Sequence, residues 1–425
     1  MTSPRPWTRD FGTGGWAVIA CAVVLALAVL TPSPSSAQTF NVIYTFTGGF
    51  DGANPLAGLT MDARGNLYGT ASEGGGGGQG TVYKLIHNAS GWQFNRLYGF
   101  SWPAGSSLDA RVLFGPDGAL YGTTYYGGAG YGNVFSLVPP PTPPRTAQDD
   151  HWIETGLYSF TGGSDGADPE GDLAFDDAGN IYGSTFFGGS NGGGAVFELT
   201  RSGNSWQESV LYSFTNDDGI WPVGVILQAG DFYGTTSFRG AFGNGAVFQL
   251  SPSGSGWTEN VLYSFPSGNS GGQSASEVIF DGAGSIYGST FNNGDGGYGP
   301  GTVWELIPSG GSCTFSTLYN FSAPGCSSPQ GPRNAPLTMD PAGNLYGTTY
   351  ADGANCYGSI FKLSPPSGGG QWTYTSLHDF TGGSDGGNPV SKVIIDASGN
   401  LYGTASCGGS ANCSHGYGVV WEITP

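Results

Sequence analysis

Four charged side chains occupy one position of four sequence repeats, where the other repeats carry Gly or Pro. The repeats align Gly58, Arg111, Asp172, Gly224, Glu277, Pro336 and Lys392. Only 10% of the chain is charged, and a purely supporting position is expected to be uniform and apolar. The mixed charge makes this position our candidate ligand site. Paired charges or solvated rim residues are the alternative interpretation.

Aromatic residues gather in Gly-rich loops that the repeats place close to this position. The candidates for ligand contact are Tyr125, Tyr126, Phe187 and Phe238. Aromatic faces beside polar groups suit sugar rings or peptides, because they offer flat apolar area with a polar edge. Packing between neighbouring loops is the alternative, since large aromatic residues are more often buried than displayed.

Three short patterns, each present seven times in constant order, define the elements that must position these residues. They are Leu-Tyr-x-Phe, apolar-Tyr-Gly-Thr/Ser, and a β-branched residue followed by an aromatic, any residue and an aliphatic. Examples are Leu97–Phe100, Leu67–Thr70 and Val82–Leu85. Successive Tyr-Gly pairs are 53, 61, 51, 54, 59 and 56 residues apart. A period of this size predicts a solenoid, propeller or array.

Each repeat holds four strand candidates, so we predict an all-β fold: a seven-bladed β-propeller with four antiparallel strands per blade. The chain begins with an outer-type strand, Asn41–Phe46, and ends with a third-type strand, Gly418–Ile423. The N-terminal strand is therefore expected to complete the last blade, which removes an exposed sheet edge. If the first strand of each repeat is innermost, the charged positions surround the mouth of the central channel, on the same face as the aromatic loops.

Two other repeated residue types are predicted to be structural. A Gly follows the Tyr of every second-pattern strand, and Gly inside a strand marks close backbone approach. An Asp begins the hairpin before that strand in five repeats, where it caps its own backbone. These Asp residues are Asp62, Asp176, Asp281, Asp340 and Asp396. Asp51, Asp165 and Asp385 lie in loops between repeats and are expected to serve turns rather than Ca²⁺.

The recurrent phrases Asp340–Thr348 and Gly194–Leu199 resemble those of the Gloeo/Verruco tandem-repeat family. The resemblance extends over the whole chain after residue 37. It implies an exported bacterial repeat protein, located outside the cytoplasm, and it implies no particular activity.

The first 37 residues are predicted to be a signal peptide, and residues 38–425 to be one propeller domain. Arg5 and Arg9 precede an apolar run, Trp16–Leu30, and the small residues Ser35–Ala37 follow. We expect a secreted or periplasmic protein without a membrane span after cleavage; an uncleaved anchor is the alternative. A net charge of −19 opposes nucleic-acid binding, which needs Lys and Arg to neutralise phosphate.

Five cysteines follow the predicted signal peptide, and export favours disulfides among them. We predict the pairs Cys407–Cys413 and Cys326–Cys356. Cys313, which stands where other repeats have Trp, is then left over; Cys313–Cys326 is the competing pair. Cys407, Cys413 and His415 lack a fourth zinc ligand, so no metal or cofactor is expected.

The leading hypothesis is a secreted, non-catalytic binding or scaffold protein, monomeric, that holds a glycan or a protein on the top face around the channel mouth. One alternative is a propeller enzyme that acts on polysaccharide or peptide, with Asp172 and Glu277 as acid and base. The two catalytic carboxyl groups of such an enzyme lie about 5–10 Å apart. Because the two residues belong to the third and fifth blades, we expect a larger separation. The other alternative is a structural surface or adhesion protein.

Overall fold

The computed structural model describes residues 38–141, 152–266, 272–274, 276–292, 299–309, 312–322, 325–326 and 330–425. The regular elements of these residues are all β-strands. The predicted signal peptide, residues 1–37, lies outside the described residues.

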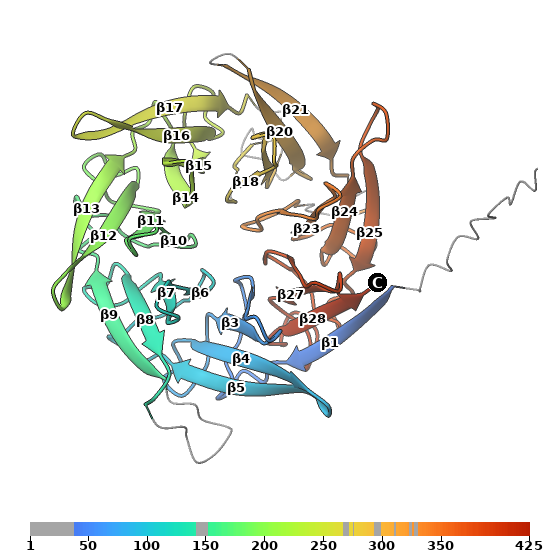
Figure 1. Cartoon of the computed structure of the whole chain (residues 1–425). Helices are drawn as coiled ribbons and strands as arrows, with labels where there is room; N and C mark the ends of the chain where they lie inside the picture. Colours follow the sequence, from blue (N-terminus) through green and yellow to red (C-terminus); the bar gives the residue numbers. More distant parts are fainter. Residues whose placement is uncertain are drawn as a thin grey trace, which may run out of the picture. The chain divides into compact units, whose positions relative to one another are not determined.

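Seven four-stranded antiparallel sheets stand in a ring, which confirms the predicted seven-bladed propeller (Figure 1). Blades 1 to 3 comprise β2 (Thr60–Met61), β3 (Leu67–Ala71), β4 (Thr81–Asn88), β5 (Gly91–Gly99); β6 (Leu113–Phe114), β7 (Leu120–Thr124), β8 (Asn133–Val138), β9 (Ile153–Ser159); and β10 (Ala174–Phe175), β11 (Ile181–Thr185), β12 (Ala195–Ser202), β13 (Ser205–Ser213). Blades 4 and 5 comprise β14 (Ile220–Gln228), β15 (Asp231–Phe238), β16 (Ala246–Ser253), β17 (Gly256–Ser264); and β18 (Ile279–Phe280), β19 (Ile286–Thr290), β20 (Thr302–Ser309), β21 (Ser312–Asn320). Blades 6 and 7 comprise β22 (Thr338–Met339), β23 (Leu345–Thr349), β24 (Ser359–Ser364), β25 (Thr373–Asp379); and β26 (Ile394–Ile395), β27 (Leu401–Ala405), β28 (Val419–Thr424) with β1 (Thr39–Thr45).

The N-terminal strand closes the ring, as predicted. β1 pairs antiparallel with β28, from Thr39 opposite Thr424 to Thr45 opposite Val419. Figure 1 shows this first strand, in blue, beside the last one, in red. Phe40 of β1 also stacks on His378 of blade 6, with ring centroids 3.7 Å apart and planes 4° from parallel. The first strand therefore pairs with blade 7 and also contacts blade 6, the two blades formed by the C-terminal part of the chain.

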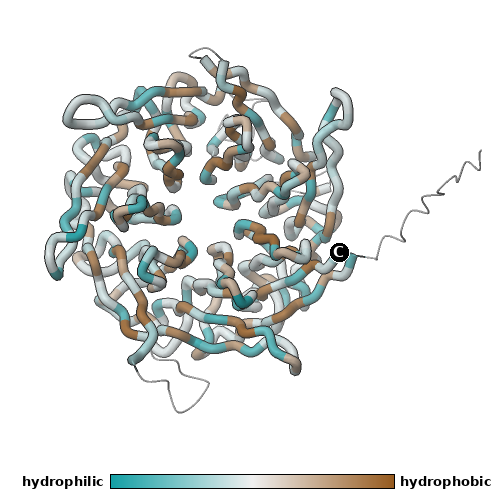
Figure 2. The backbone as a smooth tube through the Cα atoms, in the orientation of Figure 1, coloured by the Kyte–Doolittle hydropathy of each residue, from teal (hydrophilic) through white to brown (hydrophobic). Residues whose placement is uncertain are grey.

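The Gly of the second strand lies against the aromatic ring of the third strand in every blade. A Cβ placed on Gly183 would meet Cζ of Phe197 at 2.6 Å, and one on Gly347 would meet Cζ of Phe361 at 2.6 Å. Since real Cβ atoms do not approach so closely, any side chain here would displace a fully buried ring. Close approach is confirmed as the reason for these glycines. Hydrophobic residues, in brown, occur along the strands of every blade and alternate with more hydrophilic ones (Figure 2).

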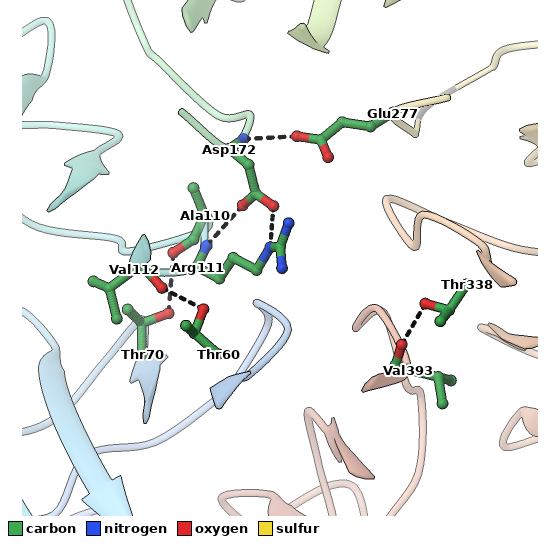
Figure 3. Close-up of polar contacts among 9 residues, drawn as sticks. All are labelled: Thr60, Thr70, Ala110, Arg111, Val112, Asp172, Glu277, Thr338 and Val393. Carbon is green, nitrogen blue, oxygen red and sulfur yellow. Dashed lines mark hydrogen bonds and ion pairs between the residues drawn. The ribbon is translucent and has the colours of Figure 1, made fainter. Parts of the chain in front are cut away.

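In five of the seven blades, the hydroxyl after this Gly ties its blade to the next one. Thr70 donates to the carbonyl of Ala110 at 3.2 Å, which links blade 1 to the inner segment of blade 2 (Figure 3). Thr404 of blade 7 donates to the carbonyl of Ala57 before blade 1, at 3.1 Å. These bonds fix the segments just before the inner strands, and those segments carry the aligned charged positions.

The repeated Asp residues serve turns, as predicted. Oδ1 of Asp176 accepts from the N–H groups of Ala178 and Asn180, and Oδ2 accepts from the hydroxyl of Tyr182 at 3.0 Å. The equivalent bonds form at the other four positions. Asp165, between repeats, likewise accepts from the backbone and side chain of Thr161 and from the hydroxyl of Tyr158. Its carboxylate is thus used within its own turn.

Candidate functional site at the channel axis

The aligned charged positions converge on one cavity at the centre of the ring, here called the axial cavity. Six of the seven aligned residues line it: Gly58, Arg111, Asp172, Glu277, Pro336 and Lys392. The seventh, Gly224, packs against the side chain of Glu277. The structure therefore brings together the four charged candidates from blades 2, 3, 5 and 7.

The side chains of Arg111 and Asp172 pair with each other, and the side chain of Glu277 binds the backbone of Asp172. Nε of Arg111 pairs with Oδ2 of Asp172, and the backbone N–H of Arg111 donates to Oδ1 of Asp172 at 3.1 Å. The backbone N–H of Asp172 in turn donates to Oε1 of Glu277 at 3.1 Å (Figure 3). This chain of contacts fits the paired-charge interpretation of the position.

Glu277 reaches Asp172 because blade 4 presents no side chain at the intervening position. A Cβ on Gly224 would lie 2.5 Å from both Cγ and Oε1 of Glu277. The expectation that Asp172 and Glu277 are kept apart by their non-adjacent blades is therefore wrong. The Glu277 side chain of blade 5 crosses over Gly224 of blade 4 and reaches Asp172 of blade 3.

Burial and charge together determine the protonation of this cluster. Burial and the nearby Asp172 raise the pKa of Glu277, while Arg111 and Lys392 oppose the rise. Burial and Arg111 lower the pKa of Lys392. Burial also acts against the charged form of Arg111, but Asp172 and Glu277 outweigh it and raise its pKa. The charge partners therefore compensate for the loss of water around Arg111, whereas burial favours the neutral forms of Glu277 and Lys392.

The space left within the axial cavity is small. Water-sized molecules can place their centres in about 40 Å³ of it. Since one buried water needs roughly 10–15 Å³ by this measure, a few waters fill it. A sugar ring does not fit among the charged residues.

A second layer of polar side chains lines the same cavity, two residues earlier in the chain. It consists of Asp109, Glu170 and Asn334. Nδ2 of Asn334 donates to Oε1 of Glu170 at 2.8 Å. Burial and Asp109 raise the pKa of Glu170 to about 7, and burial and Glu73 raise the pKa of Asp109 to about 6. The sequence analysis missed this layer; its signal was the spacing of two, which places side chains on the same side of an extended segment.

A larger pocket, here called the aromatic pocket, adjoins the axial cavity and shares Glu170, Val223 and Asn334 with it. Its volume is about 210 Å³. Its other lining residues include Phe186, Trp221, Ser237, Gln273, Phe291 and Arg333. Flat apolar rings and hydrogen-bonding groups thus face the same space.

Trp221 is the central ring of a stack on this face. Its indole lies between Phe186 and Phe238, with centroid distances of 5.2 and 5.3 Å and planes 16° from parallel in both pairs. Phe187 packs edge-on against Trp221 at 5.8 Å. Two of the predicted aromatic candidates, Phe187 and Phe238, therefore belong to this group. Trp221 itself lies in no repeated pattern and was missed.

The other two aromatic candidates lie elsewhere. Tyr125 and Tyr126 pack edge-on against each other at 4.7 Å, and neither lines the aromatic pocket. Tyr126 is 47% exposed and Phe187 is 37% exposed. The predicted aromatic set is thus divided between two places.

The Gloeobacter/Verrucomicrobia repeat model matches residues 144–299 and 228–425, more than half of the chain. The chain belongs to this repeat family. None of the curated proteins compared with it matches.

Solved structures share the propeller fold with this Gloeobacter/Verrucomicrobia repeat protein. A polysaccharide lyase, an ulvan lyase in complex with a saccharide of glucuronic acid and sulfated rhamnose, has a TM-score of 0.52 at 13% identity, covering 90% of this chain and 95% of the lyase. Another structure of an ulvan lyase has a TM-score of 0.52 at 12% identity, covering 88% of this chain and 94% of the lyase. A protein of unknown function from Dyadobacter fermentans has a TM-score of 0.44 at 12% identity, covering 91% of this chain and 98% of that protein. At these identities the likeness to the two lyase structures shows the fold alone.

Two disulfides join cysteines of this repeat protein as predicted. Cys326 bonds to Cys356 and Cys407 to Cys413, while Cys313 remains a free thiol. The competing pair Cys313–Cys326 is therefore excluded. Disulfides indicate an oxidising environment, periplasmic or extracellular. The described residues include no helix long and apolar enough to cross a membrane.

Proposed function

We propose that this protein binds saccharides on its top face, in the aromatic pocket above the axial cavity. The observation that supports this most is that Phe186, Trp221 and Phe291 line one pocket together with hydrogen-bonding side chains. A sugar ring has an apolar face that packs on an aromatic ring, and hydroxyl groups at its edge that need polar partners.

The polar groups of the aromatic pocket suit the edge of a sugar. Gln273 and Asn334 offer amide groups, and Glu170 offers a carboxyl group. The guanidinium of Arg333 is held over the rings of Phe291 and Tyr350, at 5.5 and 5.0 Å. An Arg fixed in this way presents a planar donor fork, which favours a carboxylate or sulfate substituent on the saccharide. The predicted class of ligand is therefore an acidic saccharide.

A glycan array probed with the purified chain tests this proposal. Trp221→Ala should reduce binding at least tenfold, because it removes the central ring of the stack. Trp102→Ala is the matched control: Trp102 lies in the loop between blades 1 and 2, is 59% exposed and does not line the pocket. Binding to no saccharide, or equal binding by both variants, contradicts the proposal and favours a structural role.

Catalysis on a bound saccharide is the second candidate function, and Glu170 is the observation that favours it. A carboxyl group with a pKa of about 7 at the pocket wall can give or take a proton near neutral pH. Asp172 and Glu277 are less suited, since they hold each other and Arg111. If the chain degrades a saccharide, Glu170→Gln should abolish turnover and retain binding.

A further inference from the structure

Blade 5 carries a cysteine where five other blades carry a tryptophan. Cys313 lies opposite Pro308 in the β20–β21 pair, just as Trp257 lies opposite Pro252 in blade 4 and Trp206 opposite Arg201 in blade 3. The tryptophans at this position are Trp92, Trp152, Trp206, Trp257 and Trp372. The register makes Cys313 their structural equivalent.

The tryptophans fill a space between neighbouring strands of the ring. Trp257 lies 5.1 Å from Phe232 and Trp92 lies 5.9 Å from Tyr402 of blade 7, between ring centroids. Trp372 lies 6.5 Å from Tyr287 of blade 5. Each indole therefore packs against the hydrophobic residues beside its blade.

A cavity of about 360 Å³ lies at Cys313, between blades 4 and 5. It extends inward to Tyr233, Phe280 and Ile286, which are second-strand and inner-strand residues of the two blades. The corresponding groove between blades 5 and 6, about 480 Å³, is lined by outer residues such as Glu305 and Ser316, and by Trp372. None of its lining residues belongs to an inner or second strand, so it stays at the outside of the ring. The absence of an indole at Cys313 thus opens the interior between blades 4 and 5.

We propose that this cavity, which we call the indole niche, binds a small planar aromatic molecule. In five other blades, the indole of a tryptophan occupies the equivalent position, so a planar aromatic ring suits this space. The rings of Tyr233 and Phe280 meet edge-on at 5.0 Å and form one wall, with Leu262 and Ile286 beside them. Apolar cavities left by a missing side chain bind molecules of matching shape.

Polar groups at the niche suit one N–H or O–H on the aromatic molecule. Gln249 and Asn260 line it, and Nε2 of Gln249 donates to the hydroxyl of Tyr233 at 3.0 Å. Burial raises the pKa of Cys313, which keeps the thiol protonated and uncharged beside an apolar guest. The niche therefore favours a neutral ligand of the size of indole or phenol.

Titration of the purified chain with indole tests the proposal. The wild-type chain and Cys313→Ala should bind indole saturably, with affinities within about threefold of each other. Cys313→Trp should fill the niche, weaken indole binding at least tenfold and raise the melting temperature. Binding that is absent from the wild-type chain, or unchanged in Cys313→Trp, overturns the proposal.

Alkylation of Cys313 gives a second measurement that does not depend on the folding of a variant. Saturating indole should slow the reaction of Cys313 with N-ethylmaleimide at least fivefold in the wild-type chain. An unchanged rate contradicts the niche. Because the niche is lined by other residues than the aromatic pocket, its result is independent of saccharide binding.

Discussion

Glu277 of blade 5 accepts a hydrogen bond from the backbone of Asp172 in blade 3, at 3.1 Å, over the top of Gly224 in blade 4. The contact joins two blades that are not neighbours in the ring. It converts a position that varies between repeats into a linked charge cluster at the axis. The cluster lines the axial cavity, and the adjoining aromatic pocket has room for a larger ligand.

Gly224→Ala should destabilise the propeller by about 1–3 kcal/mol more than a matched glycine substitution, because the new Cβ displaces Glu277. Gly179→Ala is the control: both glycines have positive φ, but nothing lies within 4 Å of a Cβ on Gly179. Chemical unfolding measures both. Equal losses of stability would mean that Glu277 does not cross Gly224.

Arg111→Met should reduce the free energy of unfolding by about 2–3 kcal/mol, because Asp172 and Glu277 lose their closest positive partner. The side chains of Arg111 and Asp172 are only 17% and 12% exposed, so water compensates poorly. Combining Arg111→Met with Asp172→Leu should recover part of the loss. Additive losses in the double variant would argue against the pairing.

Stability should fall as the pH rises from about 4.5 to about 7, in part because of Glu170. Its pKa is raised from 4.5 to about 7 in the folded chain, so the unfolded chain ionises first and is favoured as the pH rises through this window. Glu170→Gln should remove a contribution on the order of 1 kcal/mol to this pH dependence. Denaturation curves at pH 4.5 and pH 7.5 measure it; an identical pH dependence in the variant would be inconsistent with a raised pKa of Glu170.

Phe40→Ala should destabilise the ring by about 2 kcal/mol, because Phe40 stacks on His378 and also contacts Phe380 and Trp421. Phe242→Ala provides the comparison, since Phe242 is 60% exposed. Thermal unfolding of both variants shows the difference. A Phe40→Ala chain as stable as Phe242→Ala would count against closure of the ring by β1.

The fold was predictable because all seven repeats carry similar short sequence patterns in the same order. The glycine beneath a third-strand aromatic ring recurs in all seven repeats and the Asp that caps a hairpin in five. The surplus strand near the N-terminus matches the missing strand at the C-terminus. The disulfides followed from which cysteines share a face of the ring.

The site was predictable only in part. The alignment located Arg111, Asp172, Glu277 and Lys392 at the axis, but the crossing of Glu277 depends on the missing side chain of Gly224, which only three-dimensional packing reveals. Trp221 lies in a segment unlike those of the other repeats, so no periodic signal marked it.

A crystal structure of the chain with the saccharide that binds best on the array tests the central claim most directly. We predict that a sugar ring lies within the aromatic pocket, between the Phe186–Trp221 pair and Phe291, with its polar edge toward Arg333 and Asn334. A saccharide bound on another surface, with the aromatic pocket occupied by solvent alone, would contradict the account.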